Sequence, residues 1–450
     1  MTRASTRWAL LALVSISSIG AGCGDDPAPS RGAVHLQPVP GCESIDPTPC
    51  DVFATDCETK LMNLAACMRG SAPQPLPTIT RMTEAEYAQW LTAQIAAEPP
   101  PPNLSHYEYA LVMMRLVVAG AFQPSSMAAA QASQVWGVYR HDEDDILLIE
   151  RDRPGDDIDV NSVLLHEFVH ALQDRDQDLT IWYDAHTSSY DDTLSAMSVV
   201  EGEARLHQER FGESLLGLDP NAVDLARHFD NAVRLAEDWV RMQPSPYTAS
   251  YSGFPYEFGA RRLLPRFAQQ GPQAIADSFA APPAGTRILL DPASSDSVPA
   301  WTAPAAPTPT ADWTLTQAAT LGAWGVFMLL AQDAIAGDAD VQARSWRGDR
   351  LWVYGGSGAT VSATATVVVW RIAFADSAMA ASVAQRLSAR FTTQASGNEV
   401  TIAGTDSGAS LVWAFAPPAQ SAAAAGDEGL ALATDSSASA WLSRIFRRTY

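Results

Sequence analysis

Cysteine is scarce in this chain: there are five among 450 residues, and none follows Cys67. Thiol catalysis by the main body is therefore excluded. Basic residues are also few, 29 against 51 acidic ones, which gives a formal net charge of −22. Such a surface disfavours nucleic acid and anionic lipid as partners and favours a body that stays dispersed in solution.

Long apolar runs are missing too, with one exception at the N-terminus. Two arginines precede an apolar run over 8–14, and small residues then lead to Cys23. This order is typical of a signal peptide over 1–22, which is too short to span a bilayer. The cysteine position resembles a bacterial lipobox, so Cys23 is the expected site of lipid attachment, with ordinary secretion as the alternative. Residues 23–40 are rich in Pro, Gly and Asp and predict a tether that holds the protein to the membrane of the bacterial cell envelope.

The remaining cysteines cluster over residues 41–70. They are Cys42, Cys50, Cys57 and Cys67. An even number of clustered cysteines in an exported chain predicts two disulfides, with three possible pairings. A zinc knuckle is the alternative, but the spacing lacks CxxC pairs and the compartment is oxidising. Because residues 54–69 have helical periodicity, the segment is expected to form a small, disulfide-stapled helical cap.

Metal chemistry is predicted by His166-Glu167-Phe168-Val169-His170, an HExxH sequence. Residues four apart on a helix lie on one face, so both imidazoles can share one Zn²⁺ at about 2.0–2.1 Å from each nitrogen. Glu167 then points beside the metal, where it can take a proton from a metal-bound water. The alternative is an ordinary helix with surface histidines. The apolar flanks argue against it, because buried histidines and a buried Glu need a metal or hydrogen bonds.

A third ligand is expected in the helical stretch that contains Glu201-Gly202-Glu203. A carboxylate from this second helix would complete a His₂Glu site and leave the fourth position for water. Glu201 is preferred because it follows two valines, and Gly202 would let another backbone come close. Glu203, about 200° further round the helix, is the second choice. The alternative is an acidic pair that faces solvent.

The HExxH sequence followed by Glu201 resembles the gluzincins, the thermolysin-like zinc metallopeptidases. Asp174 lies where thermolysin-type motifs also carry an Asp. More narrowly, His-Ala-Leu-Gln-Asp (170–174) and Glu-Gly-Glu-Ala (201–204) look like a branch of uncharacterised bacterial exported lipoproteins with HExxH sequences. Looser matches to this branch are Pro255-Tyr256-x-x-Gly259, Pro282-Pro283-x-x-Thr286-x-Ile288-Leu289 and Gly348-Asp349-Arg350.

This resemblance implies a peptidase with Zn²⁺ as cofactor and a peptide or protein as substrate. The segment 256–259 resembles the Tyr-x-Lys-Gly element of gluzincin aminopeptidases, which implies that Tyr256 stabilises the oxyanion. The alternative is that Tyr256 is a packed amphipathic residue. Phe258 replaces the Lys, and no Gly-x-Met-Glu-Asn sequence precedes the HExxH, so no group is predicted to bind a free α-amine. Two alternatives stay open: a metal-binding or structural protein without turnover, and hydrolysis of a non-peptide amide such as a cell-wall cross-link.

The expected fold class is α+β. By the resemblance, residues 82–280 form a mostly helical, zincin-like catalytic body with a short edge sheet. Residues 281–313, rich in Pro and Ala, are expected to form a long loop. Residues 314–450 are expected to form a helix and then a C-terminal α+β unit.

Within this plan the pattern predicts individual elements. Thr83-x-x-Glu86 is a capping box that opens a helix through about residue 97. Residues 135–150 are typical of a hairpin. In the gluzincin plan the strand just before the HExxH helix is an edge strand that binds substrate by strand addition, and a core strand is the alternative. Further expectations are a linker at 71–81, a loop at 174–192, helices at 314–335 and 376–390, and strands at 350–354, 363–374, 399–403 and 410–415.

Overall fold

The computed structural model describes eight segments of the chain. They are residues 46–151, 153–219, 224–291, 301–307, 313–332, 338–356, 365–405 and 438–447. The expected signal peptide, Cys23, the tether, Cys42 and the strand expected at 410–415 lie outside these segments. Among the described residues, no helix combines the length and the apolar character that crossing a membrane requires.

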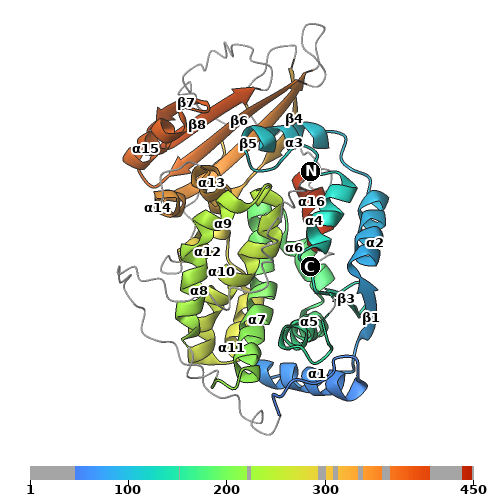
Figure 1. Ribbon diagram of the computed structural model, residues 1–450. Coiled ribbons are helices and arrows are strands. Elements are labelled where there is room, and N and C mark those ends of the chain that lie inside the picture. Colours follow the sequence, from blue (N-terminus) through green and yellow to red (C-terminus); the bar gives the residue numbers. More distant parts are fainter. Residues whose placement is uncertain are drawn as a thin grey trace, which may run out of the picture.

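The described chain is a mixed α+β protein, which confirms the expected fold class. Most helices gather in one body, and a five-stranded sheet lies at one end of it (Figure 1). The helices of the body are α1 (Thr55–Arg69), α2 (Glu84–Ala97), α3 (Leu104–Met113), α4 (Pro124–Ala132), α5 (Ile158–Gln177), α6 (Leu179–His186), α7 (Tyr190–Leu215), α8 (Leu225–Arg234), α9 (Ala236–Met242), α10 (Pro246–Gln270), α11 (Gln273–Ala280) and α12 (Thr286–Leu290). The two longest, α7 and α10, pack along each other.

Local sequence explains where several of these helices begin. The Thr83 hydroxyl accepts from the Glu86 backbone N–H at 3.2 Å, and the Glu86 carboxylate accepts from the Thr83 N–H at 2.8 Å, so the capping box is confirmed. Residues 174–192 were expected to form a loop, and this expectation is wrong because they contain α6. The start of α6 is capped by Asp178, whose side chain accepts from the Ile181 backbone N–H at 3.1 Å.

A three-stranded sheet precedes α5 in the sequence. It consists of β1 (Thr78–Thr83), β2 (Gly137–Arg140) and β3 (Asp145–Glu150), in the order β1-β3-β2. The antiparallel β2–β3 pair confirms the hairpin at 135–150, and β1 pairs in parallel with β3. The strand just before α5 is therefore central, and the expectation of an edge strand at that position is wrong. β1, in the segment interpreted as a linker, covers the side of β3 that was expected to be free.

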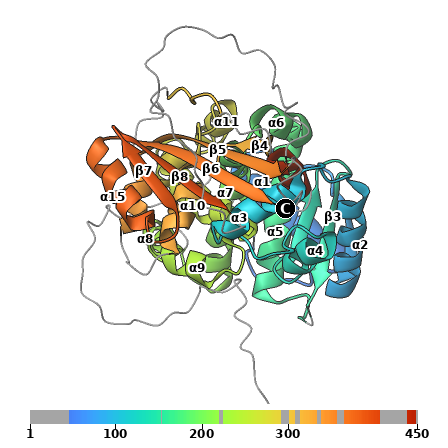
Figure 2. The ribbon, with the colours of Figure 1, turned by 90° about the horizontal axis from the view of Figure 1, so that it is seen from above.

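The C-terminal part contains a five-stranded antiparallel sheet in the order β4-β5-β6-β8-β7. Its elements are β4 (Trp313–Ala319), α13 (Gly322–Ala331), α14 (Asp338–Arg344), β5 (Trp346–Gly356), β6 (Thr366–Phe374), α15 (Ser377–Leu387), β7 (Thr392–Ser396) and β8 (Glu399–Thr405). Seen from above in Figure 2, α15 and β7 lie on the side of the molecule away from α2 and β3. The strands predicted at 350–354, 363–374 and 399–403 and the helix at 376–390 correspond to β5, β6, β8 and α15.

Two expectations for the middle of the chain are wrong. The helix expected at 314–335 begins as strand β4, because Thr314 and Thr316 favour extended backbone and β5 offers a partner. Helix α13 starts only at Gly322, which has a φ of +73°. The loop expected at 281–313 contains α12, a short helix whose five residues are all buried.

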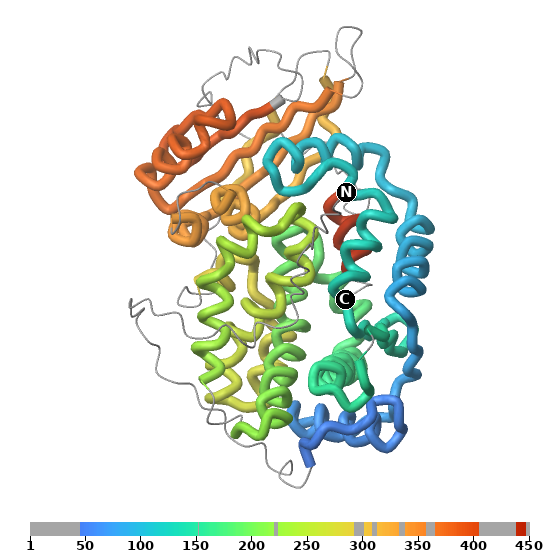
Figure 3. Tube along the Cα trace, in the orientation of Figure 1, coloured from blue at the N-terminus to red at the C-terminus, as the bar shows by residue number. Residues whose placement is uncertain are grey.

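The final helix, α16 (Ala438–Arg447), returns to the helical body (Figure 3). The hydroxyls of Ser443 and Thr193 lie 2.8 Å apart, and the rings of Phe446 and Tyr251 stack with centroids 4.1 Å apart. The end of the described chain thus packs against α7 and α10.

The predicted stapled cap is present around α1. Cys50 and Cys57 form a disulfide with Cα atoms 5.6 Å apart, and Cys67 is also disulfide-bonded. The apolar face of α1 packs on α5 in a core that includes Leu61, Leu165 and β3. The HExxH helix is therefore enclosed by α1, the small sheet and α7.

Candidate metal centre

Helix α5 carries both histidines of the HExxH sequence. Its first turn is capped by Asp157, whose carboxylate accepts from the Asp159 backbone N–H at 2.9 Å. Every residue from Val160 to Gln173 is buried, because the apolar residues of this stretch pack against elements on several sides. His166 and His170, one turn apart, lie on the side that faces α7.

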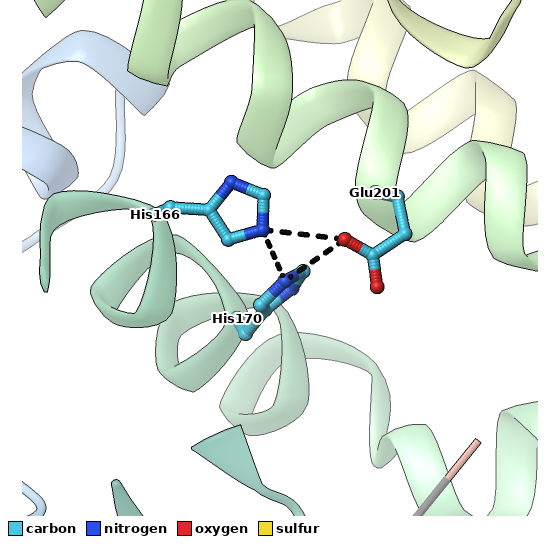
Figure 4. Close-up of side chains that lie close together, drawn as sticks. All are labelled: His166, His170 and Glu201. Atoms are coloured by element: carbon cyan, nitrogen blue, oxygen red, sulfur yellow. Dashed lines mark hydrogen bonds and ion pairs between the residues drawn. The ribbon is translucent and has the colours of Figure 1, made fainter. Parts of the chain in front are cut away.

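Three side chains meet between α5 and α7 (Figure 4). Nε2 of His166 and Nε2 of His170 lie 2.9 Å apart. Glu201, on α7, places Oε2 at 3.2 Å from the first nitrogen and 3.3 Å from the second. This buried group, formed by His166, His170 and Glu201, could hold a metal ion. The sequence-based choice of these three residues is consistent with that geometry.

The donor set fits Zn²⁺. Four tetrahedral ligands at about 2.0–2.1 Å from zinc lie about 3.3 Å from one another. The three observed separations, 2.9, 3.2 and 3.3 Å, are close to that value. Two imidazole nitrogens and one carboxylate oxygen are also the protein ligands of many catalytic zinc sites, in which the fourth position is open.

The charges of the three residues balance one another. Burial lowers the pKa of His166 to about 4. Burial acts in the same direction on His170, but the neighbouring Glu201 carboxylate outweighs it and raises the pKa of His170 to about 9. Burial opposes ionisation of Glu201, yet the positive charge of His170 lowers its pKa. A bound divalent cation would displace the proton from His170, because ligands bind metals in their deprotonated forms.

Gln173 fixes the orientation of His170. Its Nε2 donates to the backbone oxygen of Val200 at 2.9 Å and to Oε2 of Glu203 at 2.8 Å. Its Oε1 must then accept, and it lies 2.8 Å from Nδ1 of His170. The proton of the neutral imidazole is thereby assigned to Nδ1, which leaves the lone pair of Nε2 directed at the metal position.

Glu203, the second choice for the third ligand, faces away from the two histidines. One of its oxygens accepts from Gln173, and the other accepts from Nε of Arg69 at 2.6 Å. It therefore belongs to a second layer of polar contacts behind His170. Both glutamates are buried, with 1% of each side chain exposed, so the alternative of an acidic pair that faces solvent is wrong.

Glu167 lies between α5 and strand β2. Its Oε2 accepts from the Tyr139 backbone N–H at 2.8 Å. Burial raises the pKa of Glu167 to about 7. A Cβ atom added at Gly137 would lie 2.8 Å from Oε1, so the carboxylate lies directly against the backbone of β2 and needs a glycine there.

Tyr256 comes to the site from α10. Its ring stacks on that of His166 with centroids 5.6 Å apart and an interplanar angle of 10°. Tyr256 therefore lies beside a candidate ligand, and its expected role at the oxyanion stays a prediction. The next residue, Glu257, pairs with Arg205 of α7 at 3.1 Å and ties this part of α10 to the helix that carries Glu201.

Asp174, at the position shared with thermolysin-type motifs, directs its hydrogen bonds to β2 and α6. Its carboxylate accepts from the Tyr139 hydroxyl at 2.9 Å and from the Leu179 backbone N–H at 2.8 Å. It joins α5 to β2 and to the start of α6.

Sequence reasoning missed the roles of Gln173 and Arg69. Gln173 is three residues after His170, on an adjacent part of the same helical face, and that spacing was a usable signal. Arg69 offers no such signal, because it lies 134 residues from Glu203 and reaches it only through the packing of α1 on α5.

Comparison of this chain with protein-family models, with curated proteins and with solved structures finds no match. Function is therefore inferred from the arrangement of the side chains and from the resemblance of the motif.

Proposed function

We propose that this chain is a zinc-dependent metallopeptidase, with His166, His170 and Glu201 as the metal ligands. The observation that supports this most is the triangle of two imidazole nitrogens and one carboxylate oxygen, with sides of 2.9 to 3.3 Å, from two helices. A bound Zn²⁺ would supply a Lewis acid and a water of lowered pKa at this position.

Glu167 is the proposed general base and acid. With Oε2 held by the Tyr139 N–H, the carboxylate has a fixed orientation beside the ligands. From this position the carboxylate can accept a proton from the attacking water and return it to the leaving amine. The phenol of Tyr256, next to His166, would donate a hydrogen bond to the oxyanion that forms at the peptide carbonyl.

Metal binding without turnover is the second candidate, and the burial of the site favours it. His166, Glu167 and His170 each expose only 5% of their surface. Substrate would need to reach these side chains, so a closed site suits a protein that keeps the metal for structural reasons. A peptide library incubated with the purified protein, with and without a zinc chelator, separates the two candidates, since only a peptidase gives chelator-sensitive cleavage.

Glu167→Gln is the decisive variant for the peptidase. It keeps the size of the side chain and the acceptor for Tyr139 N–H but loses the base, so it should bind zinc as the wild type does. Peptide hydrolysis should fall at least about 100-fold, the lower end of what a general base contributes. Glu209→Gln is the matched control, because this α7 carboxylate pairs with Arg205 at 2.6 Å instead of facing the candidate site. Equal hydrolysis by wild type and Glu167→Gln would refute the assigned role.

A further inference from the structure

The stapled cap is fastened to the metal-binding helix at both ends. Near the start of α5, the Cys50 backbone N–H donates to Oδ1 of Asn161 at 3.1 Å, and Nδ2 of Asn161 donates to the Cys50 carbonyl at 3.0 Å. Near the end of α5, Arg69 contacts the carbonyl of Leu172 at 3.4 Å and the carboxylate of Asp176. Helix α1 thus lies across the outer side of α5 and ends beside the metal centre.

Arg69, the last residue of α1, places a buried positive charge behind the two histidines. It is only 5% exposed. Its Nε donates to Glu203 at 2.6 Å while Nη1 pairs with Asp176, so the planar guanidinium holds α7 and α5 together. Cys67, two residues earlier, is disulfide-bonded, which restrains the end of the helix that carries the arginine.

A continuous set of hydrogen bonds joins this charge to a candidate metal ligand. Arg69 holds one oxygen of Glu203, and the other oxygen accepts from Gln173 at 2.8 Å. The oxygen of Gln173 lies 2.8 Å from Nδ1 of His170. If Glu203 lost its ion pair, the amide of Gln173 would lose a fixed acceptor and could rotate, which would present an N–H group to Nδ1–H of His170.

We infer that Arg69 is a positioning residue of the metal centre: through Glu203 and Gln173, the stapled cap fixes the orientation of His170 for metal binding. This inference rests on the proposed metal centre. It assigns to the cap a direct part in metal affinity, beyond its contribution to the apolar core around α5.

The test is the zinc affinity of Arg69→Met, measured by competition with a chromophoric chelator at a temperature where the metal-free chain is folded. Loss of the group that hydrogen-bonds a metal-binding His weakens binding about 10–100-fold. Arg69 acts on that group through Glu203, so we expect a loss at the lower end of this range, about 10-fold. Arg69→Lys should lose less, because it keeps the charge and can hold Glu203. Arg175→Met is the control: this arginine lies on α5 and pairs with Asp144, which is 58% exposed, and zinc affinity should stay within about twofold, because exposed ion pairs contribute little.

A structural role alone would give a different result. Arg69→Met would then lower the unfolding temperature of the metal-free protein, while the folded fraction would bind zinc as tightly as the wild type. That outcome would overturn the inference and leave the metal centre intact. A wild type that binds no zinc would instead remove the proposed metal centre, and the inference with it.

A double-mutant cycle checks the route. Because Arg69 is inferred to act through Glu203, the loss of zinc affinity in Arg69→Met combined with Glu203→Gln should be much smaller than the product of the two single losses. Fully independent effects of the two substitutions would contradict the route through Glu203.

Discussion

At the scale of single residues, two glutamates of α7 have different positions although they lie two apart. Oε2 of Glu201 lies within 3.3 Å of both imidazole nitrogens, whereas Glu203 contacts Gln173 and Arg69. Removing the first would take away a candidate ligand, and removing the second would disturb only the support of one.

We therefore expect Glu201→Ala to bind much less than one zinc ion per chain. Glu203→Ala should still bind one zinc ion per chain at saturation, but with lower affinity. Zinc per chain is measured by elemental analysis after dialysis against a defined free zinc concentration. Circular dichroism checks that both variants fold. If Glu203→Ala bound no zinc and Glu201→Ala bound one zinc ion per chain, Glu203 would be the ligand and Glu201 would not.

The candidate ligands could be predicted from the sequence because each depends on a local pattern. The i, i+4 spacing gives His166 and His170 directly, and the apolar residues before Glu201 indicate that it is buried. Arg69 could not be predicted, since its contact with Glu203 spans 134 residues and depends on the docking of α1. Substrate access to the site could not be predicted either, because it depends on how distant segments pack around the site.

At the scale of elements, the crossing of α7 and α10 determines where Glu201 and Tyr256 lie. A Cβ on Gly202 would meet backbone atoms of Gly259 at 2.5 and 2.7 Å, and one on Gly259 would meet the Ser198 carbonyl oxygen at 2.1 Å. Two glycines thus let the helix backbones approach directly beside the candidate metal centre. The sequence predicted this close approach for Gly202, but it did not indicate which helix makes it.

Gly202→Ala should therefore destabilise the fold and weaken zinc binding together. Overpacking against backbone costs about 1–3 kcal/mol, and the better helix propensity of Ala recovers at most about 1 kcal/mol. We expect a net loss of about 1–2 kcal/mol in the free energy of urea unfolding, measured on the metal-free protein. Gly212→Ala is the control on the same helix, because its Cβ would meet only the Ser162 hydroxyl at 3.7 Å. Equal stabilities of the two variants would contradict the close contact.

The elements that sequence patterns predicted poorly are those whose partners lie far away. Strand β1 was interpreted as part of a linker, and it is defined by its parallel pairing with β3, a partner 67 residues further on. Strand β4 was expected to be helical and pairs with β5. By contrast, α2 and the β2–β3 hairpin were predicted well, because a capping box and a short turn are local signals.

At the scale of the whole molecule, two buried acids lie where the helical body meets the C-terminal sheet. Asp349, on β5, accepts from the backbone N–H groups of Leu321 and Gly322 and from the indole N–H of Trp370, at 2.8 to 3.0 Å. Asp191, on α7, accepts from the Thr286 backbone N–H at 2.9 Å. A Cβ on Gly322 would meet the Asp191 carboxylate, so the start of α13 lies between the two acids.

This junction gives the stability of the protein a definite pH dependence. Burial raises the pKa of Asp191 from 3.8 to about 7. The folded state then binds this proton more tightly than the unfolded state, so the stabilisation is complete below pH 4 and declines as the pH rises through 7. Asp191→Asn keeps an oxygen for Thr286 and cannot ionise. Between pH 5.5 and 7.5 the wild type should lose about 1–2 kcal/mol of unfolding free energy that the variant keeps. The difference in unfolding free energy, variant minus wild type, should therefore rise by that amount, as measured by urea unfolding at the two pH values.

The measurement uses chelator-treated protein, so that metal binding does not contribute to the pH dependence. Asp238→Asn is the control, since its side chain is 63% exposed and pairs with Arg241 at the surface. The difference in unfolding free energy between this variant and the wild type should be the same at both pH values. If Asp191→Asn also differed from the wild type by a constant amount, the carboxyl would already be ionised at pH 5.5. The contact between the helical body and the sheet would then have to accommodate a buried negative charge throughout this range, next to the second acid at position 349.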